Sequence, residues 1–171
     1  MNQIKTRRSF LKIAGGLAVA APFIAKFPRA SAAAKRFDPS FGTATEAAVA
    51  IQTGVISSRE LVEHVFRRID EHNPAINAFI TLAQEQAIEQ AKLADDALAK
   101  GTILGRLHGV PIVIKDLFAT AGIRTTSGSK LYESHVPNYD AVAVARLKNA
   151  GAIVIGKTNI CLLYTSPSPR D

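Results

Sequence analysis

The pattern of apolar and polar residues changes near the middle of the chain. Before about residue 100, apolar residues recur three or four positions apart, which is typical of amphipathic helices. The clearest case follows the capping-box pair Ser57 and Glu60, and we expect this helix to end at Asn73-Pro74. The pattern also predicts helices over residues 45–53 and 83–100, each closed by a glycine, and an extended segment over residues 77–82.

The second half of the chain is strand-like. Residues 110–114 and 152–155 are short β-branched runs, which are typical of buried strands. Between them lie a Gly, Ser and Thr-rich loop over residues 121–129 and a helix that we expect Asp140 to cap and that runs through Lys148. A strand, a helix and a strand in this order predict two neighbouring parallel strands and an α/β fold.

The net charge is concentrated at the amino terminus. The chain has 21 Lys and Arg against 14 Asp and Glu, a net charge of +7. Residues 1–32 hold six of these cations and no carboxylate, so the remainder has 15 cations against 14 carboxylates and a net charge of +1. Because nucleic-acid binding needs a basic face on the folded domain, we exclude a nucleic-acid partner.

The first residues have the features of an export signal. Arg7 and Arg8, followed by Ser-Phe-Leu-Lys, fit the twin-arginine pattern, and small residues up to Ala32 and Ala34 fit A-x-A cleavage sites. The apolar run from residue 13 to 24 is shorter than the roughly 20 residues of a spanning helix. We expect residues 1–34 to be a twin-arginine signal peptide, recognised by the twin-arginine export machinery and cleaved to leave no stable membrane anchor. The mature protein is then expected to be periplasmic or extracellular.

The other end of the chain lacks any periodicity. Residues 161–171 contain two Ser-Pro pairs and the only cysteine, Cys161, and they fit a disordered tail. Back-translation offers a second hypothesis, because a transposase adapter used in sequencing libraries encodes the same residues, with Ile160 as a hybrid codon. We expect residues 160–171 to be a non-native, adapter-derived tail and the natural gene to continue after Asn159.

Between these ends, the stretch GRLHGVPIVIKD at residues 105–116 closely resembles the motif around the catalytic lysine of the amidase signature family. The resemblance covers about residues 43–159, with its blocks in family order: residues 57–61, 73–79, 125–129 and 151–159. It implies that residues 35–159 are the N-terminal part of an amidase domain. The implied fold is α/β, with N-terminal helices followed by part of a mixed β-sheet with helices on both faces.

The resemblance also implies a chemistry. The family uses a Ser–cis-Ser–Lys triad, in which Lys115 corresponds to the lysine, and burial of a lysine favours the neutral form that acts as a base. The two serines lie in a Gly/Ser-rich stretch that this sequence does not contain, so we expect the chain by itself to be inactive. Thr126, Gly128 and Ser129 resemble a loop near the nucleophile and are candidates for contacting substrate. The implied parent is an exported amidase that hydrolyses a carboxamide C–N bond of a small-molecule amide without a metal or organic cofactor.

Three alternatives remain. The chain can belong to the A subunit of a tRNA-dependent amidotransferase, although an export leader argues against a role in cytoplasmic tRNA charging. It can also belong to an exported, non-catalytic binding module on the same scaffold. Residues 151–158 match the phosphate-binding pattern G-x-x-x-x-G-K-[ST], but the four intervening residues are themselves the predicted strand, which argues against a nucleotide site.

His64, His72 and His135 are scattered and predict no metal cluster, and His108 is expected to be a packing residue.

Overall fold

The computed structural model describes residues 37–160. The chain divides into two units, residues 1–34 and 35–171, and the described residues belong to the second. The predicted export signal with Arg7 and Arg8 and the predicted adapter-derived residues 161–171 lie outside the described residues. Within residues 37–160, no helix has the length and apolar character needed to cross a membrane.

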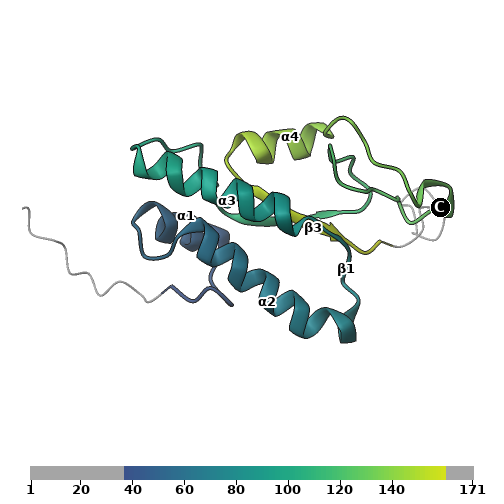
Figure 1. Cartoon of the computed structure of the whole chain (residues 1–171), viewed down its shortest axis with the longest axis horizontal. Helices are drawn as coiled ribbons and strands as arrows, with labels where there is room; N and C mark the ends of the chain where they lie inside the picture. Colours follow the sequence, from purple (N-terminus) through teal and green to yellow (C-terminus); the bar gives the residue numbers. More distant parts are fainter. Residues whose placement is uncertain (1–36, 161–171) are drawn as a thin grey trace, which may run out of the picture. The chain divides into compact units, whose positions relative to one another are not determined.

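The described residues form helices that surround a small sheet (Figure 1). In chain order the elements are α1 (Ala44–Gln52), α2 (Ser58–Ile76), β1 (Phe79–Leu82), α3 (Gln84–Ala99), β2 (Pro111–Lys115), the 3-10 helix η2 (Lys130–Tyr132), α4 (Val142–Asn149) and β3 (Ile153–Thr158).

The capping box predicted for the second helix is confirmed, but its predicted end is wrong. Glu60 N donates to Ser57 Oγ at 3.0 Å, and Ser57 N donates to Glu60 Oε2 at 2.8 Å. Helix α2 continues past Pro74 to Ile76, because a proline in the last turn removes only one hydrogen bond of the helix. The helix ends at Asn77, whose N–H still donates to Asn73 O at 2.7 Å and whose left-handed conformation (φ 52°) turns the chain out of the helix.

The sheet is mixed, as predicted. Its strand order is β1-β3-β2, with β1 antiparallel to β3 and β2 parallel to β3. The two β-branched runs are therefore the neighbouring parallel strands that the sequence predicts. Strand β2 lies at one edge of this sheet.

Helices cover both faces of the sheet, which confirms the predicted fold class (Figure 1). On one face, α2 and α3 pack against β3 in a cluster that includes Phe66, Ala87 and Ile155. On the other face, Val144 of α4 packs with Ile114 of β2 and Val154 of β3. The alternation of side chains along a strand accounts for this division between Val154 and Ile155.

The prediction that residues 110–114 form a buried strand is confirmed only for Val110 and Ile114, because Pro111 and Ile112 are partly buried and Val113 is exposed. Val113 is 47% exposed, whereas the next residue, Ile114, is 5% exposed. The reason is that the α2–α3 cluster is centred on β3 and contains no residue of β2. On this face of the edge strand, residues 37–160 thus cover Pro111 in part and leave Val113 and Lys115 exposed.

Candidate active site

Lys115 is the last residue of β2 and lies on its uncovered face. It pairs with Thr158 of β3, while Ile114 pairs with Lys157. Because successive side chains of a strand point to opposite faces, Lys115 shares the face of Val113. The Lys115 side chain is exposed, and among the described residues its ammonium group has no hydrogen-bond or ion-pair partner.

Asp116, the next residue, is completely buried and does not pair with Lys115. Its carboxylate accepts hydrogen bonds from the backbone N–H of Thr126 at 3.0 and 3.1 Å and from the Thr126 hydroxyl. Its own N–H donates to Thr158 O at 3.0 Å, which continues the pairing of β2 with β3 for one residue. The two neighbouring side chains therefore have separate surroundings, one exposed and one buried.

The three predicted substrate-loop residues lie in a turn held by Asp116. Thr126 binds the Asp116 carboxylate, and the Gly128 N–H donates to the Thr126 hydroxyl at 3.2 Å. Ser129 accepts from Leu131 N at 3.3 Å and so caps η2. The structure thus brings Thr126 next to the residue that follows Lys115, and it engages the polar groups of all three candidates in contacts within the chain.

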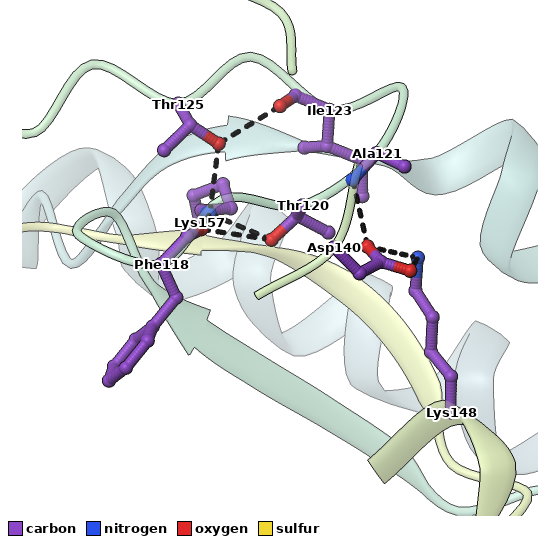
Figure 2. A network of polar contacts seen from close by, with 8 residues as sticks. All are labelled: Phe118, Thr120, Ala121, Ile123, Thr125, Asp140, Lys148 and Lys157. Carbon is purple, nitrogen blue, oxygen red and sulfur yellow. Dashed lines mark hydrogen bonds and ion pairs between the residues drawn. The ribbon is translucent and has the colours of Figure 1, made fainter. Parts of the chain in front are cut away.

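Lys157 is a second lysine near this loop, and it is completely buried. Its ammonium group donates to Phe118 O, to Thr120 Oγ1 at 2.9 Å and to Thr125 Oγ1 at 3.0 Å (Figure 2). The Phe118 ring points away from this network (Figure 2). Burial lowers the pKa of Lys157 to about 8, although Asp116 and Asp140 act in the opposite direction.

Asp140 does not cap α4, contrary to the prediction from the sequence. The residue before the helix is Ala141, and no side chain caps it. Asp140 instead accepts the N–H of Ala121 at 2.8 Å and the Lys148 ammonium at 2.8 and 2.9 Å (Figure 2). Burial acts to raise the pKa of Asp140, but the hydrogen bonds from Lys148 and Ala121 outweigh it and hold that pKa below its usual value. The aspartate therefore ties the loop to α4 instead of starting the helix.

The structure gives no support to a nucleotide site at residues 151–158. The residues between the two glycines of the pattern enter β3 instead of forming a loop that can surround a phosphate. All three N–H bonds of the Lys157 ammonium are already used within the chain. Gly156 serves the sheet, because a Cβ atom there would lie 2.5 Å from Thr81 O of β1. These contacts account for the motif without a ligand.

No histidine side chain within residues 37–160 forms a hydrogen bond with Lys115, although His135 O accepts the N–H of Thr125 at 2.9 Å. His108 is completely buried, and its Nδ1 accepts from Leu104 N at 3.0 Å, which fits the packing role that we expect. In the part of the chain that the structure describes, no group of three or more His, Cys, Asp or Glu side chains is placed to hold a metal ion.

Asp116 and Lys157 are not among the site residues predicted from the sequence, although both are buried charges bound to the same loop. One signal for Lys157 is present in the sequence, because this lysine closely follows the apolar run of residues 152–155 and so lies next to a predicted buried strand. Its partners were not readable, because Thr120 and Thr125 lie more than thirty residues earlier in a loop without periodicity.

Comparison with known proteins places this arrangement in a family. Residues 60–168 match the family model described as Amidase. The chain is 44% identical over 122 residues to the A subunit of glutamyl-tRNA(Gln) amidotransferase from Bdellovibrio bacteriovorus, covering 71% of this chain and 25% of that protein. It is 50% identical over 111 residues to the protein of the same name from Azoarcus sp., covering 65% of this chain and 23% of that protein.

Among solved structures, the peptide amidase of Stenotrophomonas maltophilia is similar, with a TM-score of 0.64 and 32% identity. The similarity covers 70% of this chain and 25% of that chain. The chain therefore spans about a quarter of the length of the relatives that it matches. On the family match and on the shared fold, the chain belongs to the Amidase family.

Proposed function

We propose that this chain is the N-terminal part of an exported amidase that hydrolyses a carboxamide C–N bond of a small-molecule amide. Lys115 acts as the base of a Ser–cis-Ser–Lys triad, and no metal or organic cofactor takes part. The observation that carries the proposal is the position of Lys115 at the carboxyl end of β2, inside the region that matches the Amidase family. The two serines belong to a part of the parent protein outside this sequence.

The proposed reaction follows the order of groups in the triad. The nucleophilic serine attacks the amide carbonyl, and its hydroxyl proton passes through the second serine to the neutral amine of Lys115. The proton then leaves with the amine product, and water hydrolyses the acyl-serine in the second half of the reaction. Because a lysine accepts a proton only when it is neutral, the exposed Lys115 needs a cover that removes water. We propose that the segment with the serines supplies this cover on the Val113 side of β2.

The same proposal predicts that the 171-residue chain alone does not turn over amides. A base without a nucleophile supplies no acyl-enzyme route. Thr126, Gly128 and Ser129 then belong to the wall of the site and not to the triad.

We also propose that the twin-arginine pair Arg7-Arg8 directs the folded parent across the membrane, to the periplasm or the cell exterior. Export of this kind separates the protein from cytoplasmic tRNA, which favours hydrolysis over transfer of ammonia to a charged tRNA.

A second function is supported by a specific observation. The two relatives with 44% and 50% identity are both named amidotransferase A subunits, and this supports the same role for the parent of this chain. In that case the ammonia released from an amide is passed on within a complex with other subunits, and the same lysine serves the same step.

The test starts from the full-length coding sequence. Cells that express the full-length protein with its leader are fractionated to locate the protein. The protein is then assayed on a panel of carboxamides without tRNA or any further protein. The proposal expects a processed periplasmic protein with amide hydrolysis that Lys115→Ala abolishes. The matched control is Lys92→Ala, which removes an exposed lysine of α3 and leaves the activity unchanged.

Two outcomes contradict the proposal. A coding sequence that lacks the serine pair makes the parent a non-catalytic binding module. A cytoplasmic protein that releases ammonia only together with partner proteins and an acylated tRNA identifies the amidotransferase instead.

A further inference from the structure

Two charged side chains, Asp116 and Lys157, are completely buried although the proposed mechanism uses neither of them. A buried charge costs free energy unless protein groups replace the water around it. The hydrogen-bond partners of these two side chains all come from one loop, residues 116–127, while Asp140 and Lys148 outside the loop act on Lys157 through their charges.

The surroundings of Lys157 fit a protonated amine. Its three N–H bonds have three acceptors, Phe118 O and the hydroxyl oxygens of Thr120 and Thr125. Each threonine hydroxyl donates its own proton to a backbone carbonyl two residues earlier, so it presents a lone pair to Lys157. A neutral amine has only two N–H bonds and would lose one of these three contacts. Lys157 therefore holds the middle of the loop against β3.

Asp116 joins the two ends of the same loop. Its carboxylate accepts from both the N–H and the hydroxyl of Thr126, and its backbone oxygen accepts from Ser127 N at 3.1 Å. Its N–H is bound to Thr158 O of β3. These bonds close the loop over residues 116–127 at the point where the chain leaves Lys115.

Asp116 and Lys157 both hold the loop of residues 116–127, Asp116 at its two ends and Lys157 at its middle. Lys157 and Thr158 are neighbours in β3, and they pair with Ile114 and Lys115 of β2. Lys157 lies on the opposite face of the sheet from Lys115, so any effect on Lys115 passes through the loop and not through contact. The opposite charge of Asp116 offsets part of the cost of burying Lys157.

We propose that Asp116 and Lys157 are positioning residues that hold the 116–127 loop closed and thereby fix the backbone from which the Lys115 side chain projects. The proposal rests on the proposed amidase function, in which the amine of Lys115 must lie within hydrogen-bond distance of a serine hydroxyl. A displacement of about 1 Å in such a site can cost on the order of a hundredfold in rate. A pair that serves stability alone would change the folded fraction and leave the turnover of the folded enzyme intact.

The test uses the full-length protein and an amide that the wild type hydrolyses. Thr125→Val removes the hydroxyl that Lys157 uses at almost constant volume, and Thr125→Ser is the matched control that keeps it. Lys157→Met removes the buried charge itself. Val62→Ala serves as the control for general loss of stability, because Val62 is buried in the α2–α3 cluster, which contains no residue of the loop.

Positioning predicts a change in catalysis beyond the change in stability. Thr125→Val and Lys157→Met lower kcat by about tenfold or more, with KM changed by less than about twofold, and they shift the pH at which kcat is half-maximal. Thr125→Ser keeps kcat near the wild-type value, and Val62→Ala lowers Tm without changing kcat. If Lys157→Met does not fold, the comparison between the two Thr125 variants decides the question.

The outcomes separate this inference from the function on which it rests. A wild-type protein without amide turnover, or with turnover that survives Lys115→Ala, removes the proposed function and this inference together. If Lys115→Ala abolishes turnover while Thr125→Val retains the kcat of Thr125→Ser, only the inference fails. It fails in the same way if Val62→Ala lowers kcat as much as Lys157→Met does.

Discussion

Gly109, just before β2, offers a sharp test of the packing between α2 and the strand that carries Lys115. Its backbone is left-handed, with φ +72°, and a Cβ atom there would lie 2.6 Å from Ser58 Oγ and 2.7 Å from Ser58 Cβ. Ser58 cannot easily move away, because its hydroxyl donates to Gly109 O at 2.7 Å and its N–H donates to Asp95 at 2.7 Å. We therefore expect Gly109→Ala to be strongly destabilising.

The magnitude follows from separate contributions. The left-handed backbone costs an alanine about 1 kcal/mol relative to glycine. Overpacking against Ser58 adds about 1–3 kcal/mol, and loss of the buried hydrogen bond adds about 1 kcal/mol. Gly54 isolates the backbone contribution, because it has the same φ of +72° but nothing within 4 Å of its Cβ position. Gly109→Ala should thus lower the free energy of unfolding by about 3–5 kcal/mol, against about 1 kcal/mol for Gly54→Ala.

Urea unfolding followed by far-UV circular dichroism measures both changes in the same protein. The double variant Ser58→Gly with Gly109→Ala should recover part of the loss, since it removes both atoms that the new Cβ meets. Equal losses for Gly109→Ala and Gly54→Ala would refute the close approach of α2 to the residues before β2.

Three further predictions address the charges and caps. Because burial lowers the pKa of Lys157 from 10.5 to about 8, the unfolded chain binds more protons than the folded chain between these pH values. The free energy of unfolding should therefore rise by about 3 kcal/mol as the pH increases from about 8 to 10.5, relative to Lys157→Met measured over the same range in urea; a flat difference would contradict the lowered pKa of Lys157. Ser57→Ala removes the capping box of α2 and should cost about 1 kcal/mol of stability in the same assay, whereas an unchanged urea midpoint would show that the cap is not needed. Arg59→Ala removes an exposed ion pair with Glu63 and should change stability by less than about 0.5 kcal/mol, with a larger loss pointing to a contact of Arg59 beyond that pair.

Local signals in the sequence predicted local structure well. The capping box of Ser57 and Glu60 and the two β-branched runs each depend on residues close together in the chain, and the capping box and both strands are confirmed, although β2 is not buried throughout. The exact end of α2 was missed because two local signals competed: Pro74 is tolerated in the last turn, and Asn77 provides the left-handed residue that ends the helix.

Side chains with long-range partners were not predictable in the same way. Asp140 has the sequence position of a helix cap, yet it binds Ala121 and Lys148, because the loop brings an N–H and an ammonium group to it. Lys157 has three acceptors that lie 32 to 39 residues earlier. No periodicity encodes such pairings, so the loop around Asp116 and Lys157 became visible only in three dimensions.

The uncovered face of β2 connects the fold to the proposed chemistry. The run Val110 to Ile114 is apolar on both faces of the strand, as in strands that are covered on both sides. Residues 37–160 cover only the Ile114 side and leave Val113 and Lys115 exposed on the other. Permanent contact of Val113 with water is unfavourable. An apolar residue at this position can instead form part of a buried surface that keeps water away from the amine of Lys115. The sequence of β2 therefore fits a cover that residues 37–160 do not provide, and in the proposed mechanism the same cover would supply the apolar surroundings in which Lys115 acts as a base.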